Sequence, residues 1–239
     1  MDATYTEIYA DLYRRHWWWR VREGILLDRI RELLGDRAHD ARILDVGCGA
    51  GLFFDALEPF GRVEGIESDP IAVAQSGKWR SRIHLGDVET FTSDKPFDVI
   101  LALDVVEHIR TPAVMLRHAA RLLASDGRMV ITTPAFDWLW TSHDKLNHHV
   151  KRYTAVEIRA LIREAGLQPV DTRYLFQSLI VPKLLVRTME ALHPVPPSVP
   201  RIPPASVNHA LETWFRAEHA IAGWLPFGSS VMSVASVAR

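Results

Sequence analysis

The feature that most constrains the fold is a glycine-rich turn that follows a short apolar run. Residues 42–46 read RILDV and lead directly into GCGAG at residues 47–51. An apolar run of this length, bounded by a turn, predicts a buried strand. Gly47, Gly49 and Gly51 allow the chain to turn sharply and let its backbone approach a ligand closely. A helix is expected to begin near Leu52, so the segment predicts a strand, a turn and a helix in succession.

Strands and helices alternate along the chain as far as residue 175. Thr154 and Glu157 form a potential capping box at the start of one helix, and Gly166 follows its end. The alternation predicts an α/β fold with a parallel sheet and helices on both faces. We expect strands at residues 42–46, 62–67, 82–85, 97–103, 127–133 and 168–175, and helices at 5–35, from 52, from 70, at 112–124 and at 154–165.

The pattern changes after residue 175. Residues 176–192 predict a strongly apolar helix, six prolines at 194–204 exclude regular structure, residues 206–225 predict another helix, and 229–238 predict a strand. We therefore expect a single domain with four parts: a helical cap at 1–36, a ligand-binding core at 37–175, a helical and proline-rich insertion at 176–228, and a last strand at 229–239.

Charge and cysteine content exclude several classes of protein. The chain has 28 Lys and Arg against 29 Asp and Glu, a formal charge of -1, so it carries no basic field that would attract nucleic acid. Cys48 is the only cysteine, which excludes an internal disulfide and a cysteine-bound metal. The N-terminal segment shows no apolar signal region, and Pro182 and Lys183 interrupt the apolar run at 175–186. We expect a cytoplasmic protein; its oligomeric state stays open.

Three acids follow three successive strands. Asp45 lies at the end of the first, Glu67 at the end of the second, and Asp87 just after the third. In a parallel sheet these ends line one crevice. There Asp45 can hold an ammonium group through water, Glu67 both hydroxyls of a ribose, and Asp87 an adenine amine, while the N–H groups of the helix after the glycine turn can hold a carboxylate. Each acid taken singly also fits an ordinary solvated loop residue, and the glycine turn alone also fits a turn without a ligand.

The order of these segments resembles a known family. ILDVGCGAG, VEGIESD, LGDVE, FDVILALDVVEHI and LLASDGRMVITTP resemble the successive motifs of class I S-adenosylmethionine-dependent methyltransferases, over roughly residues 40–175. The resemblance implies a Rossmann-like, seven-stranded, mostly parallel sheet whose last strand is antiparallel, and S-adenosyl-L-methionine as the cofactor. It also implies which residues bind each part of the cofactor: Asp45, Gly47 and Gly49 the methionine part, Glu67 with the adjacent Ser68 the ribose, Asp87 and Val88 the adenine, and Leu103 the pocket wall.

Within this superfamily, DVVEHI and WLWTSHDKLNHHVKRYTAVEI resemble the ubiquinone-biosynthesis O-methyltransferases and similar small-molecule enzymes. The resemblance implies a small-molecule acceptor, methylated on oxygen. In those enzymes a Glu-x-x-Glu-His segment is associated with a divalent metal, and Asp104, Glu107 and His108 match it here. Asp replaces the first Glu, and histidine is an unusual ligand for Mg²⁺. We therefore assign no metal.

Two histidines are candidates for catalysis. His149, in HVKRY, matches a recurrent histidine of this looser family and is our first candidate for removing a proton from the acceptor or orienting it. His108 is the second candidate, because it lies just beyond the fourth strand. The structural alternatives are that His149 bonds only to backbone and that His108 braces a turn. Trp138 and Trp140 either stack on a planar acceptor or pack the loop.

Two further segments have both a structural and a functional interpretation. Three consecutive tryptophans at residues 17–19 cannot share one helix face, so some must contact another element, the mouth of the site or a second subunit. The apolar helix at 176–192 is covered by the domain core or by the 206–225 helix, or else it forms a wall of an acceptor pocket or contacts lipid, which suits a lipid- or quinone-like acceptor.

Fold alone does not fix activity. A non-catalytic module that binds S-adenosylmethionine is the alternative to an enzyme. A dehydrogenase is a third interpretation, which Leu52 disfavours because a dinucleotide fingerprint needs glycine at that position.

Overall fold

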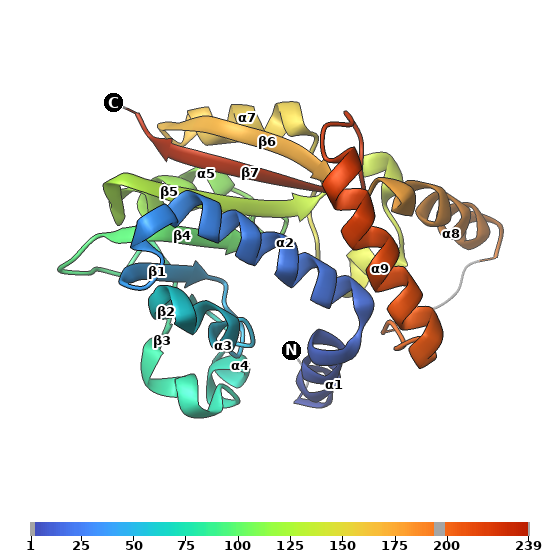
Figure 1. Cartoon of the computed structure of the whole chain (residues 1–239), viewed down its shortest axis with the longest axis horizontal. Coiled ribbons are helices and arrows are strands. Elements are labelled where there is room, and N and C mark those ends of the chain that lie inside the picture. The colour runs from blue at the N-terminus through green and yellow to red at the C-terminus, as the bar shows by residue number, and fades with distance from the viewer. Residues whose placement is uncertain (1–2, 194–198, 239) are drawn as a thin grey trace.

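The computed structural model describes residues 3–193 and 199–238 of the chain (Figure 1). Seven strands of these residues form one sheet in the order β3-β2-β1-β4-β5-β7-β6. The strands are β1 (Ala41–Val46), β2 (Gly61–Glu67), β3 (Ile83–Leu85), β4 (Phe97–Leu103), β5 (Leu123–Pro134), β6 (Leu167–Leu175) and β7 (Ser230–Val237). The order reverses between β1 and β4, and the ends of parallel strands at such a switch point form a binding crevice.

The last strand is antiparallel, as expected. β7 lies between β5 and β6 and runs opposite to both, whereas β1, β2, β3, β4 and β5 pair in parallel. The connection between β6 and β7 holds two helices, α8 (Ile180–Leu192) and α9 (Ala205–Ala222). The expected helical insertion before the last strand is therefore confirmed.

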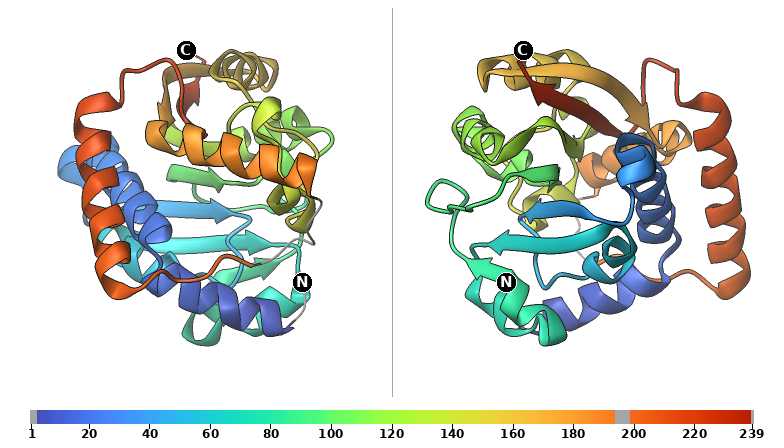
Figure 2. Two further views of the ribbon diagram at one scale, coloured as in Figure 1. Left: turned by 90° about the vertical axis from the view of Figure 1, so that its right-hand side faces the viewer. Right: turned by 60° about the vertical axis from the view of Figure 1, so that its left-hand side comes forward.

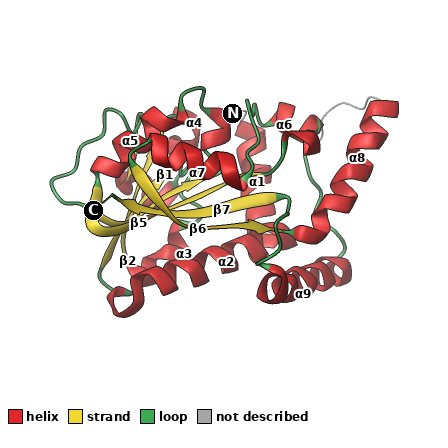
Figure 3. Ribbon diagram, turned by 90° about the horizontal axis from the view of Figure 1, so that it is seen from above, coloured by secondary structure: helices red, strands yellow, loops and turns green. Residues whose placement is uncertain are grey.

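Helices cover both faces of the sheet because neighbouring residues of each buried strand point to opposite sides. In β1, Ile43 joins the core beneath α2 (Trp17–Leu34) and α3 (Phe54–Leu57), whereas Leu44 joins the core beneath α5 (Pro112–Arg121) and α7 (Ala155–Glu164). Figure 3 shows α5 and α7 on one side of the strands and α2 and α3 on the other. The alternation in the sequence thus gives two separate cores around one sheet.

The N-terminal region forms two helices rather than the single helical run expected at residues 5–35. α1 (Ala3–Arg15) ends before His16, whose ring Nδ1 accepts a hydrogen bond from the Trp18 backbone N at 3.1 Å and caps α2. The three tryptophans pack against three different elements. Trp17 stacks on Phe215 of α9, Trp18 lies against Phe176, and Trp19 meets Tyr9 of α1 edge to face.

Several boundaries differ from those expected. α3 begins at Phe54, α8 at Ile180 rather than 176, and α9 ends at Ala222 rather than 225. β5 begins at Leu123, before the expected Gly127, because the chain bulges between the pairs Phe97–Leu123 and Val99–Arg128. α4 (Pro70–Ala74) follows its proline, and α6 (Ser142–Leu146) was not expected. Residues 194–198 of the proline stretch lie outside the described residues, and 199–204 form no helix or strand.

Four strands leave the sheet through a residue with positive φ. Gly47 follows β1 with φ 73°, Asp104 follows β4 with 57°, Phe136 lies two residues after β5 with 58°, and Phe176 follows β6 with 60°. The left-handed region is open to glycine but costs other residues energy. The sharp exits direct the following segments across the carboxyl edge of the sheet.

Among the helices of the described residues, none is both long enough and apolar enough to cross a bilayer.

Candidate functional site

The glycine turn is held between β1 and β2 by backbone hydrogen bonds. The backbone N atoms of Gly47 and Cys48 donate to the Ile66 carbonyl at 2.8 and 3.2 Å. A Cβ at Gly47 would lie 2.7 Å from Val105 Cγ2, so a side chain would force the β4 exit outward. At Gly49, where φ is 56°, an added Cβ atom would have no heavy atom within 4 Å. The turn is thus tightly packed at Gly47 and open at Gly49.

Glu67 connects this turn to the next loop. Its carboxylate accepts hydrogen bonds from the backbone N of Gly49 and from that of Asp69, both at 2.8 Å. The Gly86 N in turn donates to the Glu67 carbonyl at 2.9 Å, which brings exposed Asp87 and buried Val88 beside the end of β2. The ends of β1, β2 and β3 thus lie beside one another at one edge of the sheet, with Ser68 exposed next to Glu67.

Asp45 and Arg22 form the buried electrostatic part of the crevice. Asp45 is 4% exposed, and burial, opposed by the charge of Arg22 and reinforced by that of Glu67, raises the pKa of its carboxyl to about 7. Arg22 reaches over from α2, pairs with the Asp104 carboxylate at 2.8 Å and donates to Thr132 Oγ1 at 3.0 Å. An arginine from the N-terminal helix thus stands among the strand-end acids.

The helix after the glycine turn does not supply the expected anion site. α3 holds only four residues, and the Gly51 N and Phe54 N donate to the carbonyls of Cys48 and Gly51 in the turns before it. A helix this short has a negligible macrodipole. The guanidinium of Arg22 is the alternative partner for a ligand carboxylate.

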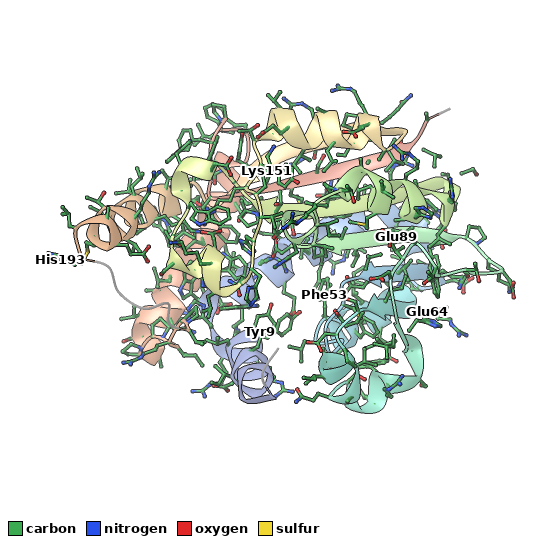
Figure 4. All side chains as sticks on the ribbon, turned by 180° about the vertical axis from the view of Figure 1, so that it is seen from behind. Tyr9, Phe53, Glu64, Glu89, Lys151 and His193 are labelled. Atoms are coloured by element: carbon green, nitrogen blue, oxygen red, sulfur yellow. The ribbon has the colours of Figure 1, made fainter. Side chains whose placement is uncertain are left out.

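The N-terminal helices lie across this end of the sheet. In the view of Figure 4, Tyr9 on α1 and Phe53, just after the glycine turn, lie nearer the middle of the picture than Glu64 and Glu89, which lie to its right. Burial raises the pKa of the Tyr9 hydroxyl, and the charges of Arg22 and Asp104 act on it. An open cleft of about 590 Å³ borders the outer side of the same turn, between α1–α2 and α3–α4, and includes Ala50, Gly51 and Leu52.

Beyond β4, Glu107 is a carboxyl buried without a hydrogen-bond partner among the described residues. Its side chain is 0% exposed, and neither oxygen forms a hydrogen bond of good geometry, although the Thr133 hydroxyl acts on it. Burial, reinforced by the charge of Asp104, raises the pKa of Glu107 well above its usual value. A proton on Glu107, or a cation bound beside it, would remove the cost of this buried charge.

His149 is oriented by a buried ion pair. Its Nδ1 lies 2.8 Å from Asp144 Oδ1, and Asp144 also accepts from Nε and Nη2 of Arg152 at 2.8 and 2.7 Å. Asp144 and Arg152 are 0% and 2% exposed. Because the carboxylate can only accept, it fixes the proton on Nδ1 and leaves a lone pair on Nε2 of His149. This histidine is held by a side chain, so the backbone-bonded alternative does not apply to its ring.

His108 completes the group at this end of the site. Its ring lies 4.8 Å from that of His149, centroid to centroid, at 81°, and the two loops are joined by the Val150 N donating to the Glu107 carbonyl at 2.7 Å. Burial and the neighbouring His149 lower the pKa of His108. Glu107, His108 and His149 each offer one ligand atom within 4.8 Å of the others.

Asp104 does not belong to this group of three. Its carboxylate is engaged by Arg22 and by Thr132, whose hydroxyl donates to Oδ1 at 3.0 Å. The set matched from the sequence was Asp104, Glu107 and His108, whereas the structure groups the last two with His149.

α8 lies beside the loop that carries His149. Glu190 of α8 accepts from the backbone N and the hydroxyl of Ser142, at 2.8 and 2.6 Å, and so fixes α8 to α6. Lys183 lies on the same face of α8 as Glu190 and is partly buried. Burial, together with the charge of Arg152, lowers the pKa of Lys183 to about 8. No residue of α8 is fully buried, so neither the core nor α9 covers its apolar side.

Four side chains of this site are assigned no role by the sequence: Arg22, Asp144, Arg152 and Lys183. Each of these side chains acts on the site through contacts with residues that are distant in sequence or that lie in an irregular loop. Only Asp144 and Arg152 had a local signal, because both lie in the polar segment at 138–153 that also contains His149.

Residues 18–172 match a protein family described as a methyltransferase domain. A curated relative is a ubiquinone biosynthesis O-methyltransferase of Cereibacter sphaeroides, 31% identical over 153 residues, which are 55% of this chain and 62% of the relative. This chain spans about two fifths to three fifths of the length of the first curated relatives it matches.

Solved structures share the fold over almost the whole chain. A S-adenosylmethionine-dependent methyltransferase from Clostridium acetobutylicum is similar with a TM-score of 0.61 at 12% identity, covering 99% of this chain and 98% of that one. The [4+2]-cyclase SpnF is similar with a TM-score of 0.55 at 20% identity, covering 88% and 81%.

Proposed function

Because this chain belongs to the methyltransferase domain family, we propose that it transfers a methyl group from S-adenosyl-L-methionine to an oxygen of a small-molecule acceptor. The observation that carries the proposal is the orientation of His149: Asp144 holds its Nδ1 proton and leaves the Nε2 lone pair as a base, beside Glu107 and His108. The proposed cofactor residues are those around Gly49 and Glu67.

The residues present fit the cofactor. Two acids at adjacent strand ends, Asp45 and Glu67, repel one another, and a ligand that carries positive charge relieves this repulsion. Arg22 can pair with a ligand carboxylate, and the space in front of Gly49 is open to a ligand. Glu67 is our proposed ribose acid, with Ser68 beside it, while Asp87 and Val88 are the proposed adenine side and Leu103 the proposed pocket wall.

When bound, the cofactor supplies a methyl group on a sulfonium centre, whose departure as a neutral thioether drives the transfer. His149 Nε2 accepts the proton of the acceptor hydroxyl, and the Asp144–Arg152 pair stabilises the imidazolium that forms. Glu107 and His108 line the same place, where Glu107 is a buried donor for an oxygen and His108 an alternative base.

A lipid- or quinone-like acceptor fits the surroundings of α8. Its charged side faces the site through Lys183 and Glu190, and its opposite side is an exposed apolar stripe flanked by Arg187. A helix of this kind suits contact with an apolar acceptor or with a lipid surface. The stripe comprises Val181, Leu184, Leu185, Met189 and Leu192, which are 38–69% exposed.

The alternative is a module on the same fold that binds the cofactor without methyl transfer, or that promotes another reaction. The similarity to a [4+2]-cyclase supports this alternative, because that protein has a similar fold and a different activity.

The proposal is tested first by ligand titration and then by turnover. S-adenosylhomocysteine should bind with a Kd in the micromolar range, about -8 kcal/mol, and a nicotinamide dinucleotide should not. Binding without methylation of any phenolic, lipid or carboxylate acceptor would favour the non-catalytic alternative.

On an acceptor found in this way, His149→Ala should lower kcat by roughly a hundredfold to ten-thousandfold and leave the Kd for S-adenosylhomocysteine within about twofold. His108→Ala is the matched comparison and should have the smaller effect. EDTA should change turnover little. Inhibition by EDTA that Mg²⁺ or Zn²⁺ reverses would instead identify Glu107, His108 and His149 as metal ligands and remove the base role of His149.

A further inference from the structure

α9 carries an exposed apolar stripe with the spacing of a helix–helix seam. Val207, Ala210, Trp214, Ala217 and Ile221 follow one another at intervals of three, four, three and four residues, and all are exposed. Val207, Trp214 and Ile221 retain 48%, 59% and 74% of their accessible surface, and Trp224, three residues further, retains 80%. This is the a/d spacing by which two helices pack.

The other side of α9 fixes the helix to the domain, so the stripe is a rigid surface. Phe215 is buried and stacks on Trp17, with ring centroids 4.6 Å apart. Glu218 is buried and accepts hydrogen bonds from the backbone N of Ser178, at 2.8 Å, and from its hydroxyl. Figure 2 shows α9 on the outside of α2, at the edge of the molecule.

The stripe lacks the charges that a membrane-binding helix uses. Ser206, Thr213 and Ala220 flank it on its outer side and are uncharged. Arg216, the nearest exposed cation of the helix, is bonded to Glu212 at 3.0 Å. Interfacial helices carry Lys and Arg around the apolar face, as α8 does with Lys183 and Arg187, so the composition of α9 favours another helix as the occupant.

The stripe is complementary to itself when one copy is turned end for end. About a point midway between Trp214 and Ala217, Trp214 comes opposite position 217, Ala210 opposite 221, and Val207 opposite Trp224, which lies in the turn just after the helix. Two of these three layers place a large side chain against alanine, which is how facing helices interdigitate. A two-fold axis requires this reciprocal pairing of residues.

We propose that two copies of this chain associate through α9 in an antiparallel pair, with Trp214 packed on Ala217 of the partner subunit. Trp214 and Trp224 alone would bury roughly 200–350 Å² per copy, since a tryptophan buries about 150–250 Å² in full. With the aliphatic members of the stripe, the interface lies at the low end of the range for stable dimers, about 1,200 Å² in total. For an interface of this modest size we expect a reversible dimer, with a Kd on the order of micromolar.

Sedimentation velocity of the full chain between about 1 and 200 µM tests the association. A monomer–dimer equilibrium is expected for the unchanged chain, and Trp214→Glu should shift it to monomer by at least tenfold in Kd, with an unchanged thermal unfolding curve. Leu185→Glu on α8 is the matched control and should leave the dimer intact. A monomer at every concentration, or equal loss of dimer in both variants, would overturn the proposal.

Cysteine cross-linking tests the direction of the pair. The double variant Ala210→Cys with Ile221→Cys should give a covalent dimer under mild oxidation, and neither single variant should. Cross-linking by Ala210→Cys alone would show parallel helices and refute the two-fold arrangement. Vesicles of phosphatidylcholine with phosphatidylglycerol complete the test, because binding that Trp214→Glu abolishes would assign the stripe to a membrane instead.

Discussion

Glu67 is the residue at which the cofactor assignment can be tested most directly. The variants are Glu67→Ala, which removes the carboxylate, and Glu67→Gln, which keeps its shape and one acceptor oxygen. In the free protein the carboxylate accepts from the backbone N of Gly49 and of Asp69 at 2.8 Å. Removing it therefore affects both the proposed ribose contact and the shape of the glycine turn.

The magnitude follows from the bonds that are lost. A hydrogen bond to a charged group contributes about 1.5–3 kcal/mol, so Glu67→Ala should raise the Kd for S-adenosylhomocysteine by roughly tenfold to a hundredfold. In Glu67→Gln the amide oxygen still accepts one of the two backbone N–H groups, and a neutral acceptor forms a bond about half as strong as a charged one. We expect its Kd to rise by about fivefold.

Isothermal titration calorimetry with S-adenosylhomocysteine measures these changes without an acceptor. Glu164→Ala is the control, because Glu164 is exposed at the C-terminal end of α7, far along the chain from the proposed cofactor residues. A Kd for Glu67→Ala equal to that of the unchanged chain would refute the ribose assignment. A loss shared by Glu164→Ala would show that the net negative charge, rather than the contact, is responsible.

Two further predictions concern buried charges. Burial raises the pKa of Asp45 to about 7 from 3.8, so the unfolded chain loses this proton first and the folded state loses stability as pH rises from about 4 to 7. Asp45→Asn should remove this loss, so that the advantage of the variant in unfolding free energy grows over that range to on the order of 4 kcal/mol and is constant above it. Urea titrations at several pH values measure this difference, and a difference that does not change with pH would contradict the assignment. Arg152→Met should leave the Asp144 carboxylate buried without its cation and cost about 3–5 kcal/mol of unfolding free energy. The control Arg163→Met, at an exposed position of α7, should cost less than about 0.5 kcal/mol. Equal losses in the two variants would show that the Asp144–Arg152 pair contributes nothing specific to stability.

The parts of the structure that local sequence determines could be predicted. The glycine turn, the buried strands and the capping box of α7 each depend on residues within a few positions, and Thr154 does accept from the Glu157 N at 3.2 Å while Glu157 accepts from the Thr154 N. The strand-end acids followed from the same local reading, because the ends of parallel strands must meet at one edge.

Contacts between distant segments left no comparable signal. Arg22 and Thr132 are 110 positions apart, and nothing around Arg22 distinguishes it from the other arginines of α2. α6 holds only five residues, too few to show helical periodicity. His149 could be singled out as a candidate base from the sequence of its segment. The role of Asp144 could not, because it depends on the hydrogen bonds that the buried Arg152 side chain donates to its carboxylate.

The residues at positive φ carry a consequence for selection acting on this chain. Such a backbone costs a non-glycine residue on the order of 1–3 kcal/mol, so glycine would relax it at Asp104, at Phe136, at Phe176 and at His148, where φ is 57°. At Phe136, stacked on Tyr174, and at Phe176, in the core, the lost ring would cost about 3–5 kcal/mol and outweigh the gain. At Asp104 the lost carboxylate would leave the largely buried Arg22 without its ion-pair partner, which opposes the gain as well. At His148, which is exposed, nothing comparable opposes it. A screen that rewards thermal stability alone would therefore favour glycine at His148, directly before His149, and would loosen the site while improving the scaffold.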